Sequence, residues 1–159
     1  MFRGEGMQGY ERHLEAALGY LHLGMPQEAH EELDAIPPER KADPLVLRAR
    51  AYIYCEMKDW ESLRDVSAFL VSILPDDSQH WIWLGFAARR CDSITEAERI
   101  LLDAVERHPR EPMLHFNLAC YAAQTERVPL ARQRLAEAIR LDPTITKLAV
   151  DDPDLQPLW

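Results

Sequence analysis

The sequence predicts an all-α protein, a solenoid of stacked antiparallel helix pairs. Three observations predict it: regularly spaced prolines, columns of small residues with the same spacing, and helix-start signals between them. Pro75, Pro109 and Pro143 are each 34 residues apart, and each follows an apolar stretch of helical periodicity. Because proline cannot continue a helix, each of these stretches ends there. Equal spacing of such ends indicates a repeated structural unit.

Small and apolar residues fall into register when the chain is shifted by 34 positions. Small side chains let two helices approach to the short end of the usual range of about 8–10 Å. A single helix pair leaves one apolar face uncovered, so stacked copies are needed to close a core. The columns are Ala17, Ala51, Gly85 and Ala119; Ala29, Leu63, Ala97 and Ala131; Ile36, Leu70, Ala104 and Ala138; Tyr20, Tyr54, Ala88 and Ala122; and Leu33, Ser67, Leu101 and Leu135.

The periodic stretches predict four helix pairs, and start signals support their boundaries. Asp43 followed by Pro44 indicates an N-cap with proline in the first turn. Ser93 and Glu96 have the spacing of a capping box. Pro37-Pro38 predicts a short second helix in the first pair. The predicted ranges are 10–23 with 26–36, 44–57 with 60–73, 78–90 with 94–107, and 112–124 with 127–140.

The C-terminal stretch after the last pair predicts a cap with a short helix near 144–150. A solenoid needs its last repeat covered, and this stretch carries apolar residues. Its acidic cluster, Asp151, Asp152 and Asp154, has some likeness to a calcium site. It lacks the glycine and the distal glutamate of an EF-hand loop, so we expect these side chains to cap a helix and to be solvated.

These residues resemble the tetratricopeptide repeat (TPR) family, of the small bacterial type. Trp81, Leu84 and Gly85 reproduce its W-x2-L-G signature. His13 and His115 stand at the tryptophan position in the first and fourth copies, where we expect packing roles. The stretches 117–121 and 152–158 are similar to the close of several bacterial TPR proteins. The resemblance implies a right-handed superhelical solenoid of four TPR-like repeats with a C-terminal cap.

The repeat register divides the chain into three parts. We expect a flexible N-terminus over residues 1–9, a single TPR domain over 10–145 and a C-terminal capping segment over 146–159. The expected repeats cover 10–43, 44–77, 78–111 and 112–145.

Composition and motif searches favour a protein without catalytic or metal chemistry. The formal net charge of −9 disfavours nucleic-acid binding, which needs a basic surface. Cys55, Cys91 and Cys120 form no CxxC pair. No GxSxG, HExxH, P-loop or GxGxxG motif occurs. No apolar run reaches membrane-spanning length, and the first residues lack the apolar region of a secretory signal. We therefore expect a cytoplasmic protein with no enzymatic activity, cofactor, metal, nucleic-acid or membrane binding.

The TPR resemblance also implies a concave groove lined by the first helix of each pair. The inward positions here are mainly apolar and aromatic, with arginines at intervals. Such a lining suits a peptide or amphipathic helix that carries a carboxylate, because arginine binds carboxylates in a bidentate manner. The expected groove residues are Leu14, Leu18, Arg48, Tyr52, Ile82, Trp83, Phe86, Arg89, Arg90, Met113, Phe116 and Asn117, with Leu21, Cys55 and Cys120 on the same face.

The expected function is a non-catalytic protein–protein interaction module, an adaptor or scaffold. Two alternatives remain open at this point. The chain is similar in size and repeat type to small chaperones of type III secretion clients. It also fits a self-associating homodimer, whose groove is covered by a partner copy or by its own tail through Leu158 and Trp159.

Overall fold

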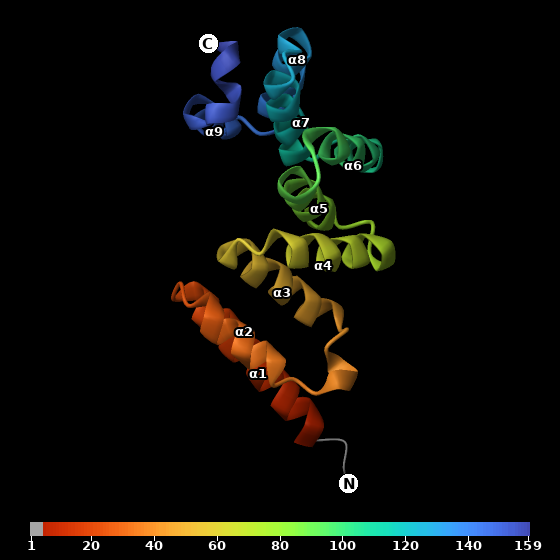
Figure 1. Cartoon of the computed structure of the whole chain (residues 1–159), viewed down its shortest axis with the longest axis vertical. Helices are drawn as coiled ribbons and strands as arrows, with labels where there is room; N and C mark the ends of the chain where they lie inside the picture. The colour runs from red at the N-terminus through yellow and green to blue at the C-terminus, as the bar shows by residue number, and fades with distance from the viewer. Residues whose placement is uncertain (1–4) are drawn as a thin grey trace. The chain divides into compact units, whose positions relative to one another are not determined.

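The structure is a computed structural model that describes the backbone of residues 5–159 and the side chains of residues 10–159. Within that range the chain is helical and contains no strand. It forms two compact units, of which the first ends at Ile73 and the second is Leu74–Trp159. The helices are α1 Glu5–His22, α2 Pro26–Asp34, η1 Pro38–Arg40, α3 Pro44–Met57, α4 Trp60–Ile73, α5 Ser78–Cys91, α6 Ile94–Arg107, α7 Pro112–Gln124, α8 Val128–Leu141, α9 Ile145–Asp151 and η2 Pro153–Leu158 (Figure 1).

The predicted helix pairs are confirmed, and most boundaries agree within one residue. Helix α2 is shorter than predicted and ends at Asp34. Pro37 and Pro38 explain the early end, because the α conformation is disfavoured just before a proline. Helix α1 begins at Glu5. The expected flexible segment 1–9 thus lies partly outside the described residues.

Acidic N-caps fix the starts of three first helices and repeat with the 34-residue period. The carboxylate of Asp43 accepts a hydrogen bond from the backbone N–H of Leu45 at 3.0 Å. Asp77 and Glu111 do the same for the N–H two residues later, at 2.9 and 3.2 Å. Each cap satisfies a backbone donor that the first helical turn leaves without a partner. Ser93 accepts from the N–H of Glu96 at 3.0 Å, as the capping-box spacing predicts.

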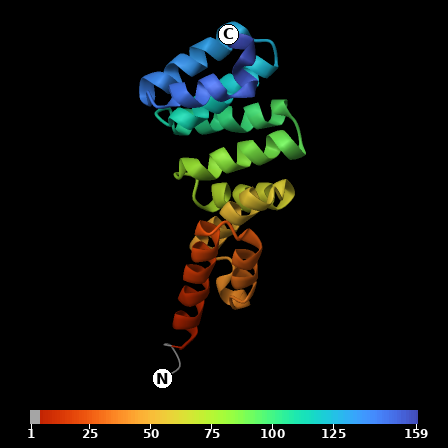
Figure 2. The ribbon, with the colours of Figure 1, turned by 90° about the vertical axis from the view of Figure 1, so that its left-hand side faces the viewer.

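The first unit packs α1 against α2 and α3 against α4, with α2 also contacting α3. Figure 2 shows α1 and α2 side by side as the red and orange helices. Ala17 and Ala29 are fully buried where the first two helices meet, as the small-residue columns predict. The buried core of this unit comprises Tyr10, Ala17, Ala29, Leu33, Ile36, Val46, Ala49 and Ile53.

The second unit packs α5 against α6 and α7 against α8, and α6 also contacts α7. Gly85 and Leu101 lie close together in the first of these pairs. A β-carbon on Gly85 would lie 2.5 Å from Cδ2 of Leu101, whose side chain is fully buried. Any larger residue at position 85 would therefore overpack the crossing.

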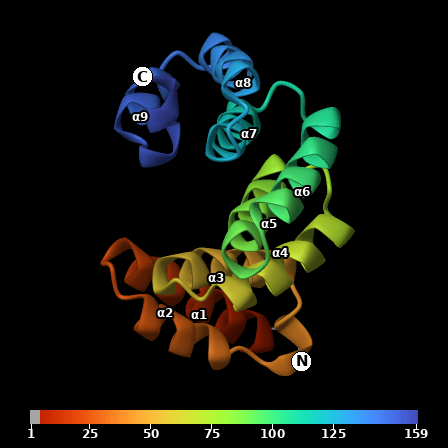
Figure 3. The same cartoon turned by 45° about the horizontal axis from the view of Figure 1, so that its top comes forward.

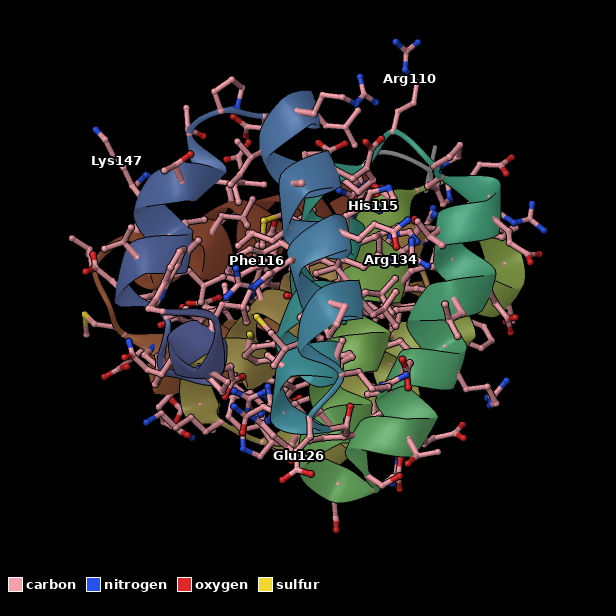
Figure 4. The ribbon with its side chains drawn as sticks, turned by 90° about the horizontal axis from the view of Figure 1, so that it is seen from above. Arg110, His115, Phe116, Glu126, Arg134 and Lys147 are labelled. Atoms are coloured by element: carbon pink, nitrogen blue, oxygen red, sulfur yellow. The ribbon has the colours of Figure 1, made fainter. Side chains whose placement is uncertain are left out.

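The turn inside each helix pair places one residue at a common position of the repeat. Gly24, Lys58 and Glu126 occupy it with φ angles of 69°, 57° and 62°. Asp92, at the same position in the third pair, has φ −115°. Glu126 is labelled at the α7–α8 turn in Figure 4. Lys58 and Glu126 hold a left-handed conformation that side chains with a β-carbon adopt at a cost.

The C-terminal segment covers the end of the second unit. The predicted short helix is α9, and the 3₁₀ helix η2 follows it. Leu155 and Leu158 are buried in the same core cluster as Phe116 and Ile145, so this segment is part of the hydrophobic core. Trp159 remains exposed. None of the described helices has the length and apolar character needed to cross a bilayer.

Candidate functional site

The most informative site lies where residues 152–159, hereafter the tail, pack on α7 (Figure 3). Side chains of the helices hold the main chain of the tail. Gln124 donates to the carbonyl oxygen of Asp154 at 2.9 Å, and Arg132 donates to that of Leu158 at 2.9 Å. Together with the burial of Leu155 and Leu158, these bonds fix the 3₁₀ helix η2 against the last repeat.

An ion pair joins the tail to α5. Arg89 donates to the carboxylate of Asp154, and each side chain is only about a quarter exposed. The guanidinium also lies 5.5 Å from the centre of the Tyr121 ring. Its hydrogen bond with Asp154 raises the pKa of Arg89. Burial raises the pKa of Tyr121 to about 12, so this ring stays neutral beside the cation at physiological pH.

Between α5, α7 and the tail an open cavity of about 430 Å³ remains, hereafter the second-unit pocket. Arg90 covers one side, with its guanidinium 3.6 Å from the centre of the Phe86 ring and a hydrogen bond of 3.1 Å to the Phe86 carbonyl. Both arginines thus combine a charge with an aromatic surface. The lining residues are Phe86, Arg89, Arg90, Asn117, Cys120, Tyr121, Asp152, Pro153 and Asp154.

A second cavity, of about 410 Å³, lies in the first unit, hereafter the first-unit pocket. It is formed by α1 and α3, the first helices of their pairs. Leu18 and Tyr52 are 45% and 47% exposed there, although both are large and apolar or aromatic. Its lining residues are Leu18, Leu21, His22, Tyr52 and Glu56.

Comparison with known proteins supports the fold. The chain is similar in fold to MamA. The solved structure of MamA 41-end from Desulfovibrio magneticus RS-1 matches with a TM-score of 0.75 and 18% identity, over 84% of this chain and 76% of that one. The MamA RS-1 ArsTM double mutant matches with a TM-score of 0.74 and 18% identity, over 84% and 75%. No protein-family model and no curated protein matches the sequence.

The expected groove residues divide into those that line the two pockets and those that do not. Leu18 and Tyr52 line the first-unit pocket, and Phe86, Arg89, Arg90 and Asn117 line the second-unit pocket. Leu14, Ile82 and Met113 instead pack, partly buried, against the cores of their units. Arg48 is half-buried and engaged in an interaction of its own.

Two expected groove residues are buried instead. Phe116 is 5% exposed and belongs to the same core cluster as Leu155 and Leu158, which arrive with the tail. Trp83 is also 5% exposed, and its ring stacks on His80 at 6.0 Å. Neither side chain offers an open surface to a partner.

Three donor groups at the edge of the second-unit pocket lie close enough together to consider a metal. The ligand atoms of Cys120, Asp152 and Asp154 are all within 4.8 Å of one another. Asp154 is paired with Arg89, and Asp152 caps η2 by accepting from the N–H of Asp154 at 2.9 Å. Burial raises the pKa of the Cys120 thiol to about 12, whereas a metal needs the thiolate. These groups therefore fit the protein contacts that they make better than a metal.

The tryptophan position of the repeat has a hydrogen-bonding role that the sequence pattern did not reveal. Trp81 donates its indole N–H to the carbonyl oxygen of Pro75 at 2.8 Å. His115, 34 residues later, bonds through Nε2 to the carbonyl oxygen of Pro109 at 2.8 Å. Arg134 donates to its other nitrogen at 3.4 Å, and Figure 4 shows both side chains on one side of the α7–α8 pair. His115 thus forms hydrogen bonds in addition to the packing contacts that the sequence predicted.

Proposed function

We propose that the protein is a non-catalytic interaction module that binds a polypeptide segment of a partner on the inner faces of its first helices. One observation carries the proposal: the second unit already holds a polypeptide there, its own tail. A surface that binds a short segment of its own chain has the chemistry to bind one from another protein.

That chemistry has three parts. Leucine side chains enter the core, an arginine meets a carboxylate, and side-chain donors reach main-chain carbonyls. Every polypeptide carries main-chain carbonyls, so this part of the binding does not depend on the partner's sequence. The arginine–carboxylate contact does, because it selects an acidic side chain.

The second-unit pocket leaves room beside the tail for a partner. Its open side offers Arg90 stacked on Phe86, with Asn117 on the neighbouring helix. Arginine and aromatic residues are enriched among the side chains that dominate binding energy at interfaces. We therefore expect a partner segment with an apolar side chain and a carboxylate. The net charge of −9 supports a protein partner over a nucleic acid.

Peptide display on the immobilised full chain tests this function. Selected peptides are synthesised, and their affinities are measured by calorimetry. We expect peptides rich in Asp, Glu and Leu whose affinity falls at least tenfold in Arg90→Glu, because a carboxylate then meets a like charge.

A matched control is Arg99→Glu, which makes the same charge change at an exposed position of α6. Affinity should change less than twofold there. If display yields no acidic binder, or if the two variants weaken binding equally, the proposed function is wrong.

A further inference from the structure

The two pockets occupy the same positions of the repeat, two copies apart. Adding 68 to Leu18, Leu21 and His22 gives Phe86, Arg89 and Arg90, and adding it to Tyr52 and Glu56 gives Cys120 and Gln124. Four of these five second-unit residues line the second-unit pocket, and Gln124 holds the tail. The contacts of the tail therefore show how a polypeptide is held at these positions.

The groups that hold the acidic tail are replaced in the first-unit pocket. Arg89, which pairs with Asp154, corresponds to Leu21. Gln124, which donates to a tail carbonyl, corresponds to Glu56, a side chain that only accepts when ionised. The first-unit pocket thus lacks the carboxylate-binding group and carries a carboxylate instead.

That carboxylate has no cation of its own among the described residues. Glu56 is exposed at the pocket rim, and no ion pair involves it. His22 lies on the same rim and is cationic only when protonated. Arg48 lies two turns before Glu56 on α3, outside the pocket lining, and is engaged within the protein.

The floor of the first-unit pocket is apolar and uncovered. Leu18 and Tyr52 leave nearly half of their surfaces exposed, side by side with Leu21. In the second unit Cys120, which corresponds to Tyr52, is instead buried in the same core cluster as the leucines of the tail. Exposed apolar groups gathered in one cavity and rimmed by charge are typical of a site that a partner covers.

We infer that the first-unit pocket binds a segment of a partner protein that presents a large apolar side chain next to a lysine or arginine. The apolar side chain covers Leu18 and Tyr52, and the cation pairs with Glu56. The two units thereby select segments of opposite charge. This inference goes beyond the proposed function, and it would stand if the second-unit pocket bound nothing except its own tail.

Two fluorescein-labelled peptides test it on the full-length protein. They share the same leucines and phenylalanine and differ only in carrying three lysines or three glutamates. Fluorescence anisotropy at about 0.15 M salt limits long-range attraction by the acidic protein. We expect the basic peptide to bind at least tenfold more tightly than the acidic one.

Charge reversal in the pocket then identifies the binding group. In Glu56→Lys the protein should bind the acidic peptide more tightly than the basic one. Glu61→Lys changes the net charge equally but lies on α4 outside the pocket, so this variant should keep the preference for the basic peptide. Tyr52→Ala should weaken binding of the basic peptide at least tenfold. Circular dichroism shows whether each variant keeps its helices.

Several outcomes would overturn the inference. Equal affinity for the two peptides would show that the pocket has no charge preference. An equal loss of basic-peptide affinity in Glu56→Lys and Glu61→Lys would show that the preference comes from the overall charge of the protein. A dimer by light scattering that Tyr52→Ala dissociates would make a second copy the occupant instead. Arg90→Ala, which removes the cation of the second-unit pocket without adding a carboxylate, should leave basic-peptide binding unchanged and so separates this site from that of the proposed function.

Discussion

Arg89 and Asp154 form an ion pair across 65 positions of the sequence, and this pair closes the second unit. It joins the third repeat to the segment after the fourth, so it connects parts that the repeat pattern alone does not bring together. Both side chains lie mostly out of water, where a charge-assisted bond is stronger than on an open surface.

A double-mutant cycle measures the coupling free energy between Arg89 and Asp154. We expect Arg89→Ala, Asp154→Ala and the double variant to give a coupling free energy of about 1 kcal/mol in urea unfolding, because a partly exposed pair is still partly screened. The pair Arg99 and Asp103 on α6, with both side chains more than half exposed, is the control and should couple less. A zero coupling for Arg89 and Asp154 would show that this ion pair does not help to hold the tail.

Gly85 should be intolerant of a side chain. In Gly85→Ala the new β-carbon would meet the buried Leu101 at 2.5 Å, so we expect a loss of about 1–3 kcal/mol and a Tm lower by several degrees. Gly19 is also helical but has nothing within 4 Å of an added β-carbon. Gly19→Ala should therefore stabilise the protein by about 0.5–1 kcal/mol. Similar melting temperatures for both variants would contradict the close crossing.

Replacing Glu126 by glycine should stabilise the protein. Its φ of 62° is left-handed, so Glu126→Gly should raise stability by about 0.5–1 kcal/mol, since glycine adopts this conformation without strain. Asp92 occupies the same repeat position with a negative φ, and Asp92→Gly should lower stability. Thermal melts followed by circular dichroism compare the two. A loss of stability in both variants would argue against strain at Glu126.

Cys120 should report release of the tail. The residue is 4% exposed beside Asp152, and burial raises the pKa of its thiol to about 12, so alkylation of the native protein near pH 8 should be very slow. Asp154→Ala combined with Leu158→Ala should loosen the tail, lower that pKa and speed alkylation at least tenfold. Mass mapping separates Cys120 from the more accessible Cys55 and Cys91, whose rates should not change. Fast alkylation of Cys120 in the native protein would show that the tail does not protect it.

The helices were predictable because their signals are local. An acidic cap followed by proline marks where α3 or α7 begins without reference to distant residues. The small-residue columns likewise predicted the close crossing at Gly85, because a glycine among alanines at one repeat position has a clear steric meaning.

The site was only partly predictable because the tail is not part of the period. Phe116 has an inward repeat position, yet Leu155 and Leu158 bury it, and no spacing rule places those leucines there. No spacing rule identifies Asp154 as the partner of Arg89 either. A signal was present in the apolar residues of the tail, which predicted a cap and left open that Leu158 and Trp159 cover the groove. In the structure Leu158 is buried, whereas Trp159 is exposed.

The covalent attachment of the tail sets a threshold for any competitor at Arg89. A segment joined by a short linker is present at its site at an effective concentration on the order of millimolar. A free peptide at micromolar concentration must therefore bind about a thousandfold more tightly than the tail to occupy the site half of the time. Weak acidic segments, which are abundant in any cell, would not reach Arg89, whereas the first-unit pocket has no such local competitor among the described residues.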